Sequence, residues 1–267
     1  MHSQINFGYP WFINYIHLVL AGFLIGLFAV GWYFHWRRPV LAVLGLASAW
    51  ALASWTIIRF GVDMNGRAAL PTQAFLPSGA GRVLDMGAGT GRSTLMVLEN
   101  RPRATVVALD QFGQSYEGHF GKPPAGESTV DAGRATLERN LSAAGVEDRA
   151  SIQPGDMRHM PLPSDSFDAV VSAYAIDHLS PDGITRALAE ANRVLKPGGQ
   201  FLLIVIAKDR WLLFAFGPLI AHAPMITADF WDQKLRDAGF RILQDGTEPA
   251  TKFVLARKDA AAPPMPL

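Results

Sequence analysis

The stretch VLDMGAGTGRST, residues Val83–Thr94, decides the fold. An apolar run leads into Gly87, Gly89 and Gly91, and a helical pattern follows. Glycine at the end of a buried strand lets the backbone come close to a ligand at the start of the next helix. The dinucleotide fingerprint G-x-G-x-x-G/A requires a small residue where this chain has Arg92, so the spacing counts against a nicotinamide dinucleotide.

Strand-like and helical patterns alternate on both sides of this stretch. We predict strands at residues 82–86, 105–110, 151–153, 167–173, 200–207, 241–244 and 252–256, and helices at 92–99, 130–144, 182–194 and 228–238. Continuous apolar strands between helices indicate a sheet that is covered on both faces. The predicted fold class is therefore α/β, a Rossmann-like doubly wound sheet of seven mostly parallel strands, which binds ligands at the carboxyl ends of its strands.

Composition excludes several classes of function. The 267 residues include 24 Lys+Arg and 23 Asp+Glu, and this net charge of +1 leaves no positive excess for a nucleic acid partner. Because there is no cysteine, disulfides, zinc–thiolate sites, iron–sulfur clusters and thiol nucleophiles are excluded. We predict no metal site and expect the chemistry to come from a bound cofactor, histidine or carboxylates.

The first sixty residues have the composition of a membrane region. Residues 1–36 carry no Asp, Glu, Lys or Arg, and a second uncharged run follows Arg37 and Arg38. A helix over residues 11–36 would be ~39 Å long, enough to cross a hydrocarbon core of ~30 Å. We therefore divide the chain into a membrane region at 1–60 with helices at about 11–36 and 40–58, a connector with one short helix at 61–80, the α/β domain at 81–258 and a disordered tail at 259–267.

Small residues recur at four-residue spacing in both apolar segments. Gly22 and Gly26 form such a pair in the first, and Gly45, Ala49 and Ala53 repeat it in the second. This spacing would let the two helices pack closely as a hairpin, or let hairpins of two copies of the chain pair as a homo-oligomer. The alternative is that Gly and Ala are simply common in membrane helices.

Further motifs follow the glycine turn in a fixed order. They are VVALD, which ends at Asp110, GDMRHMPLPSDSFDAVVSAYAIDHL, which begins at Gly155, and RVLKPGGQFLLIV, which ends at Val205. Together with VLDMGAGTGRST, they resemble class I S-adenosylmethionine-dependent methyltransferases, in particular the methyltransferase type 11 branch that includes ubiquinone- and menaquinone-biosynthesis enzymes. The resemblance covers most of the soluble domain and implies S-adenosylmethionine as cofactor, with S-adenosylhomocysteine as product.

The resemblance also implies which residues bind the cofactor. Asp110 would bind the ribose, Asp156 the adenine amine, and Met157 would lie against the adenine. Residues Ser172 to Tyr174 would line the cofactor near its methyl group. Gln111, beside Asp110, would also contact the cofactor. The methionine part of the cofactor would be surrounded by Asp85, Gly87, Ala88, Gly89 and Gly91. The alternative reading is that Asp85 caps the turn and that Asp110 is a surface strand end.

Methyl transfer is an in-line displacement that depends mainly on positioning in a dry pocket. An acceptor hydroxyl, thiol or acidic carbon also needs a base, and His178 is the leading candidate, with Asp177 to orient it and Tyr174 beside the methyl group. The alternatives are a structural histidine and a helix-capping aspartate. Tyr116 and His119 lie in an insertion after Asp110, which would be either a lid or a surface insert.

The sequence therefore predicts a membrane-anchored methyltransferase whose acceptor partitions into the membrane, such as a lipid headgroup or a quinone-like molecule. The apolar segment at 210–226 would be a second membrane contact, a hydrophobic mouth for the acceptor or a buried helix. Two arginines at each end of the second segment leave the orientation open, and we place the domain in the cytoplasm because the cofactor is cytosolic. A small diffusible thiol, amine or metalloid acceptor, and a non-catalytic tethered interaction protein, are the alternatives.

Overall fold

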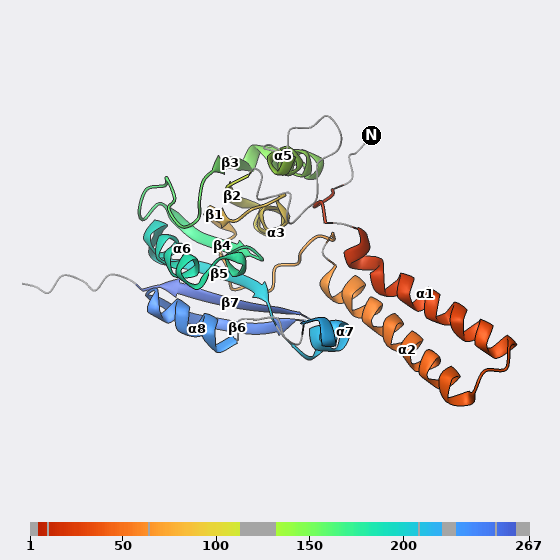
Figure 1. The fold of residues 1–267 in the computed structure, drawn as a ribbon. Helices are drawn as coiled ribbons and strands as arrows, with labels where there is room; N and C mark the ends of the chain where they lie inside the picture. The colour runs from red at the N-terminus through yellow and green to blue at the C-terminus, as the bar shows by residue number, and fades with distance from the viewer. Residues whose placement is uncertain are drawn as a thin grey trace, which may run out of the picture.

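The computed structural model describes residues 5–9, 11–63, 65–112, 132–207, 209–220, 228–248 and 250–259. Tyr116, His119 and most of the predicted tail lie outside the described residues. A hairpin of two long helices extends from one side of an α/β domain (Figure 1). The hairpin and the domain correspond to the two kinds of composition in the sequence.

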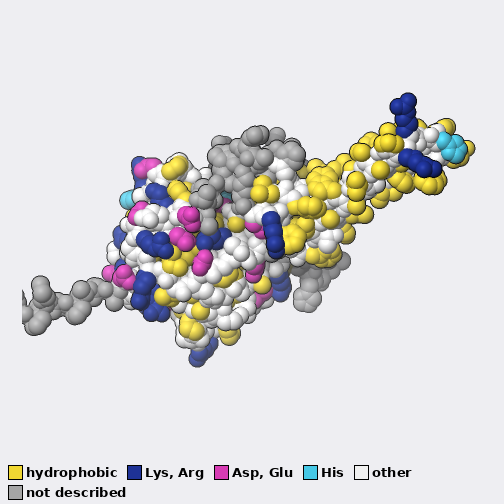
Figure 2. All heavy atoms as spheres, turned by 90° about the horizontal axis from the view of Figure 1, so that it is seen from below, with side chains coloured by type: hydrophobic (Ala, Val, Ile, Leu, Met, Phe, Trp, Pro, Cys, Tyr) yellow, Lys and Arg dark blue, Asp and Glu magenta, His cyan; other side chains and the backbone are white. Residues whose placement is uncertain are grey.

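The hairpin consists of α1 (Trp11–Tyr33) and α2 (Arg38–Thr56), and a π-helical stretch, η1 (Ile57–Val62), continues α2 toward the domain. By length and composition both helices could cross a membrane, with mean hydropathy of 2.1 and 1.8 over their most apolar windows. Only 17% and 28% of these windows is buried, which differs from a core helix of a soluble protein. Hydrophobic side chains cover the hairpin, and basic side chains lie at its tip (Figure 2).

The small-residue spacing in α1 does not form the helix contact. A side chain at Gly22 or Gly26 would meet nothing within 4 Å, so the close approach predicted through these glycines is wrong. Gly45 on α2 does face α1, where Phe28 lies 3.7 Å from the position of an added Cβ. The hairpin therefore packs through a large aromatic side chain against a glycine.

The base of the hairpin is joined to the domain by α7 (Arg210–Ile220). The His17 Nε2 atom lies 2.9 Å from the Ala215 carbonyl oxygen, and the Trp50 indole donates a hydrogen bond to the Phe214 carbonyl at 2.8 Å. The predicted alternative of a buried helix is wrong for the described part of this segment, because Trp211 and Phe214 are 40% and 46% exposed. These contacts place α7 against α1 and α2 of the hairpin.

The domain contains a seven-stranded sheet, which confirms the predicted fold class. The strand order is β3-β2-β1-β4-β5-β7-β6, and β7 runs antiparallel to both of its neighbours. The strands are β1 (Ala80–Met86), β2 (Arg103–Asp110), β3 (Ala150–Pro154), β4 (Phe167–Ala173), β5 (Leu195–Ile206), β6 (Phe240–Glu248) and β7 (Thr251–Lys258). The order reverses between β1 and β4, where doubly wound sheets bind their ligands.

Helices cover both faces of the sheet. One face carries α3 (Arg92–Asn100) and α5 (Ala132–Ala144), and the other carries α6 (Pro181–Val194) and α8 (Ala228–Asp237). Short 3-10 turns, η3 (Glu147–Arg149) and η4 (Ile176–His178), precede β3 and α6. Side chains on β1 alternate between the two cores, because Val83 packs on the α3 side and Leu84 on the α6 side.

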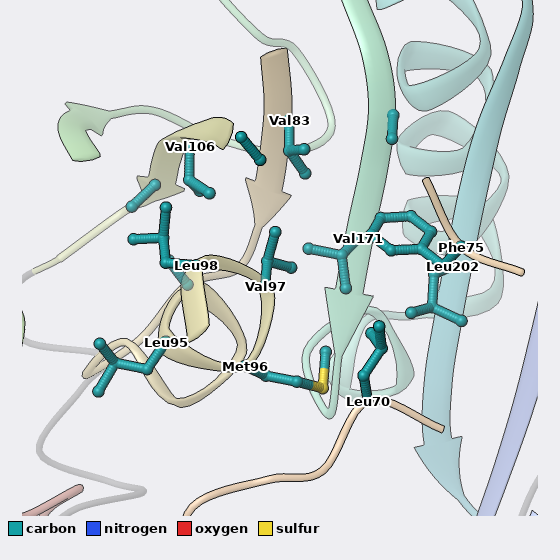
Figure 3. Packing of buried hydrophobic residues seen from close by; sticks show 14 of the residues in the cluster. Leu70, Phe75, Val83, Leu95, Met96, Val97, Leu98, Val106, Val171 and Leu202 are labelled. Atoms are coloured by element: carbon teal, nitrogen blue, oxygen red, sulfur yellow. The ribbon is translucent and has the colours of Figure 1, made fainter. Parts of the chain in front are cut away.

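The connector contains no helix within residues 65–79, so the short helix predicted there is wrong. Leu70 and Phe75 are buried instead and pack on the core beside Val171 and Leu202 (Figure 3). The Arg101 guanidinium donates a hydrogen bond to the Phe75 carbonyl at 2.8 Å. The connector is thus fixed to the sheet as irregular chain, because its prolines interrupt helix formation.

Candidate active site

The turn after β1 adopts a backbone conformation that favours glycine. Gly87, Gly89 and Gly91 have φ values of 87°, 54° and 94°, all in the left-handed region. An added Cβ at Gly87 would lie 2.3 Å from the Cβ of Ala175, so a larger residue would not fit. The Gly87 and Ala88 amides donate hydrogen bonds to the Leu109 carbonyl at 2.8 and 3.0 Å, which ties the turn to the end of β2.

Asp85 lies behind this turn. It is fully buried, and its carboxylate accepts hydrogen bonds from the hydroxyls of Ser93 at 2.8 Å and Thr94 at 2.5 Å in the first turn of α3. Burial raises the pKa of Asp85 to about 6. Asp85 does not border the cavity described below, so the structure favours the alternative in which it holds the turn.

Asp110 lies at the end of β2 and faces the glycine turn. Its Oδ2 atom accepts a hydrogen bond from the Gly89 amide at 2.8 Å, and burial raises its pKa. Because each carboxylate oxygen accepts more than one hydrogen bond, both oxygens keep capacity for ribose hydroxyls. Gln111 follows it and borders the same cavity. Asp110 is therefore a half-buried residue of the site and not a surface strand end.

Asp156 and Met157 have different surroundings. Both carboxylate oxygens of Asp156 accept hydrogen bonds from the Arg158 guanidinium, which holds the pKa of Asp156 below its ordinary value. Met157 borders the cavity, and its methyl group lies 2.9 Å from the position of an added Cβ at Gly87. In this arrangement only Met157 of the pair faces the cofactor space, and the adenine contact of Asp156 stays a prediction.

The residues at the end of β4 divide between the two sides of the sheet. Ser172 is fully buried, and its hydroxyl donates a hydrogen bond to the Met86 carbonyl at 2.9 Å, away from the cavity. Because side chains alternate along a strand, Ala173 borders the cavity instead, followed by Tyr174. Within the predicted stretch Ser172–Tyr174, the position of Ser172 is thus wrong, while Ala173 and Tyr174 border the cavity as predicted. The Tyr174 hydroxyl shares a hydrogen bond of 2.9 Å with the Thr251 hydroxyl.

His178 and Asp177 lie in η4, directly after this strand. His178 borders the cavity, as expected for a base near the transferred methyl group. Burial raises the pKa of Asp177, and the charge of His178 partly opposes that effect, so the two side chains interact electrostatically. The Oδ2 atom of Asp177 also accepts a hydrogen bond of 3.4 Å from the Ile206 amide, which links the pair to the end of β5.

A single cavity of about 710 Å³ connects these residues to the base of the hairpin. The glycine turn, Asp110 and Met157 border one part of it. Ile13 from the first turns of α1 and Phe60 from η1 border another part, together with connector residues up to Pro71. Phe60 is 69% exposed, so the cavity wall continues into the exposed apolar surface of the hairpin. The glycine turn and the apolar hairpin were each predicted from the sequence, but the cavity that both of them border was not.

The chain before α1 also forms part of the site, which the sequence analysis missed. The Thr90 hydroxyl in the glycine turn donates a hydrogen bond to the Phe7 carbonyl at 2.9 Å, and Asn140 of α5 donates to both the Asn6 and Thr90 carbonyls. Tyr9 then borders the cavity, and burial raises its pKa. This short irregular segment has no apolar periodicity from which its place in the site could be predicted.

Arg92 is a second residue that the sequence analysis did not assign to the site. It begins α3, where a cation is unfavourable for the helix dipole. Its guanidinium donates hydrogen bonds to the carbonyls of Gly66 at 2.9 Å and Asp63 at 3.1 Å, and its Cζ lies 5.8 Å from the centre of the Tyr174 ring. An uncompensated cation at a helix start was the available signal that Arg92 has a partner elsewhere.

The groups that border the cavity suit a nucleoside-containing sulfonium cofactor. The left-handed glycines shape the turn so that Gly87 and Ala88 border the cavity, and Asp110 offers acceptors for two ribose hydroxyls. Within the described residues, His, Asp and Glu form no group of three or more that could hold a metal ion. The residues present therefore fit S-adenosylmethionine.

Comparisons with known proteins agree with this assignment. Residues 125–203 match the methyltransferase domain family known as Methyltransf_11. The ubiquinone/menaquinone biosynthesis C-methyltransferase UbiE of Syntrophotalea carbinolica is 30% identical over 148 residues, which cover 55% of this chain and 53% of that protein. An uncharacterized methyltransferase of Mycobacterium bovis is 32% identical over 155 residues, which cover 57% and 52% of the two chains. The chain thus spans about half the length of the curated relatives it matches.

Solved structures share the fold at lower identity. A SAM-dependent methyltransferase from Methanosarcina mazei aligns with a TM-score of 0.52 and 17% identity over 68% of this chain and 94% of its own. The [4+2]-cyclase SpnF aligns with a TM-score of 0.52 and 18% identity over 80% and 82% of the two chains. These likenesses show the fold alone, because one fold serves different reactions.

The fold, the glycine turn with Asp110 and the sequence matches identify the α/β part of this chain as a class I S-adenosylmethionine-dependent methyltransferase domain. Its cofactor is S-adenosylmethionine. Within that class, the domain is similar to the methyltransferase type 11 branch, which contains the ubiquinone- and menaquinone-biosynthesis relatives.

Proposed function

We propose that this protein is anchored in a membrane by the α1–α2 hairpin and methylates an acceptor that partitions into the bilayer. The observation that carries the proposal is the cavity shared by the cofactor turn and the hairpin base, through Ile13 and Phe60. A hydrophobic acceptor entering beside η1 would reach Tyr174 and His178 without crossing bulk water. Tethering also raises the effective concentration of the enzyme at such an acceptor.

The acceptor class that the relatives favour is quinone-like. Names of two relatives refer to ubiquinone/menaquinone biosynthesis and to demethylmenaquinone methylation. A lipid headgroup fits the same hairpin argument. The catalytic domain would face the cytoplasm, where the cofactor is made, which requires the arginines in the hairpin tip to lie on the opposite side of the membrane.

In this proposal the residues of the chain bind, orient and move a proton. The cofactor supplies an electrophilic methyl group when bound. An acceptor carbon or hydroxyl loses a proton as it takes that group, and His178 would accept the proton while buried Asp177 stabilises the imidazolium. Tyr9, from the chain before α1, and Tyr174, directly after β4, would orient the acceptor.

The test is transfer of a radiolabelled methyl group from S-adenosylmethionine by the full-length protein in vesicles made from bacterial membrane lipids. We expect label in the organic extract. His178→Gln should lower its rate by ~100-fold or more and leave S-adenosylhomocysteine binding unchanged. His35→Gln, in the hairpin turn far from the cavity, is the matched control and should behave like wild type. Label found only in water-soluble acceptors, or no label from protein that binds the product, would contradict the membrane acceptor.

A further inference from the structure

A second cavity of about 490 Å³ lies at the base of the hairpin and opens to solvent. It is bordered by Trp11, Asn14 and Tyr15 in the first turns of α1 and by Arg59 and Asp63 at the end of η1. Tyr9 and Asp63 also border the catalytic cavity, so the two cavities share a wall. None of the sequence motifs accounts for this second cavity.

Asn14 borders this cavity and carries a polar atom that is unpartnered in the described part of the chain. It is only 5% exposed, and its Oδ1 atom has no hydrogen-bond partner among the described residues. A buried amide oxygen without a donor costs free energy, because water no longer solvates it. A ligand that carries a hydrogen-bond donor would satisfy this atom.

The charges around the cavity indicate what else the ligand carries. Arg59 and Asp63 form an ion pair of 3.0 Å, and each side chain is about a third exposed. Such a pair is weak, and a guanidinium with five donors retains several for an anion. The first turn of α1 contains no acidic residue, and a helix N-terminus favours an anion such as phosphate. The site therefore suits a zwitterion with a phosphate and a nearby ammonium group.

The position of the cavity at the base of the hairpin favours a lipid among the zwitterions that could bind there. If the hairpin spans the bilayer, its base lies at the level of the headgroups, where aromatic side chains such as exposed Trp11 and Tyr15 are favoured. We propose that this cavity binds the headgroup of phosphatidylethanolamine, with its phosphate at Arg59 and its ammonium group at Asn14 and Asp63. This inference rests on the proposed membrane anchoring, and the bound lipid is a docking ligand rather than the methyl acceptor.

The test is native mass spectrometry of full-length protein in detergent with added phosphatidylethanolamine, phosphatidylglycerol or phosphatidylcholine. The last has the phosphate but no hydrogen-bond donor on its quaternary amine. We expect phosphatidylethanolamine to be retained about tenfold more tightly than phosphatidylcholine, the effect of one charge-assisted hydrogen bond. Arg59→Gln and Asn14→Leu should each lower its retention by about tenfold, whereas Arg37→Gln in the hairpin turn should not.

Two further measurements distinguish a failure of the headgroup site from a failure of the proposed membrane anchoring. Binding of S-adenosylhomocysteine by each variant reports folding and the cofactor site, and flotation with vesicles of phosphatidylcholine alone reports anchoring. Protein that floats and binds the product but retains the three lipids equally would overturn the headgroup site and leave the proposed function intact. Stronger retention of phosphatidylglycerol, or wild-type behaviour of Arg59→Gln, would also overturn it. Protein that does not float would contradict the anchoring itself.

Discussion

Gly87→Ala tests whether the glycine turn has the conformation that cofactor binding needs. At this position φ is 87°, and the new methyl group would lie 2.3 Å from the Ala175 Cβ and 2.9 Å from the Met157 methyl. A left-handed backbone costs an alanine ~1–2 kcal/mol, and overpacking adds ~1–3 kcal/mol. We therefore expect the variant to lose ~2–5 kcal/mol of unfolding free energy, with weaker binding of S-adenosylhomocysteine.

Gly145→Ala is the matched control, because its φ is 65° but nothing lies within 4 Å of the added methyl. It should cost only the backbone part, ~1–2 kcal/mol, and leave product affinity unchanged. Urea unfolding in detergent gives the free energies, and calorimetric titration gives the affinities. If Gly87→Ala matched Gly145→Ala in both measurements, the close packing of the turn against Ala175 and Met157 would be refuted.

Three other substitutions test separate parts of the structure. Burial raises the pKa of Asp85 from 3.8 to about 6, so the folded protein holds this proton more tightly than the unfolded chain, and the stability from this group is present at low pH and lost as the pH rises through 6. The free energy of unfolding should fall by about 1 kcal/mol between pH 5 and pH 7. Asp85→Asn should remove this pH dependence when urea unfolding is measured at the two pH values. Arg92→Gln deprives the Gly66 and Asp63 carbonyls of their donor, so amide exchange in residues 65–69 should accelerate at least several-fold. Unchanged exchange would contradict a stabilising role of these two hydrogen bonds in the connector. His17→Leu removes the contact with the Ala215 carbonyl and should speed amide exchange in α7. The free energy of unfolding should change little, because the variant also removes the buried Nδ1 atom of His17, which lacks a partner among the described residues. Equal amide exchange of α7 in variant and wild type would contradict the attachment of α7 to the hairpin.

The sheet could be predicted from sequence because its signals are local. The central parallel strands β1 and β4 consist mostly of apolar residues. The strand predicted at 167–173 has the bounds of β4, and the one predicted at 82–86 is β1, which begins earlier, at Ala80. Asp110 could be placed for the same reason, since the end of a strand fixes the edge of the sheet at which its side chain lies.

The parts of the site that the sequence did not predict depend on contacts between distant segments. Tyr9 reaches the cavity because Asn65 binds its backbone and because Thr90 and Asn140, far along the chain, bind Phe7 and Asn6. Ser172 was misplaced because the motif located the strand end but not which face each side chain takes. A shift of one residue along a strand exchanges the two faces.

The central claim is that S-adenosylmethionine binds between the glycine turn and Asp110. Calorimetric titration of full-length protein in detergent with S-adenosylhomocysteine, beside Asp110→Ala, tests it most directly. The account predicts saturable binding by wild type and a loss of at least about tenfold in affinity for the variant, because the ribose hydroxyls lose a charged acceptor. Folded wild-type protein that does not bind the product, or a variant that binds it equally well, would contradict the account.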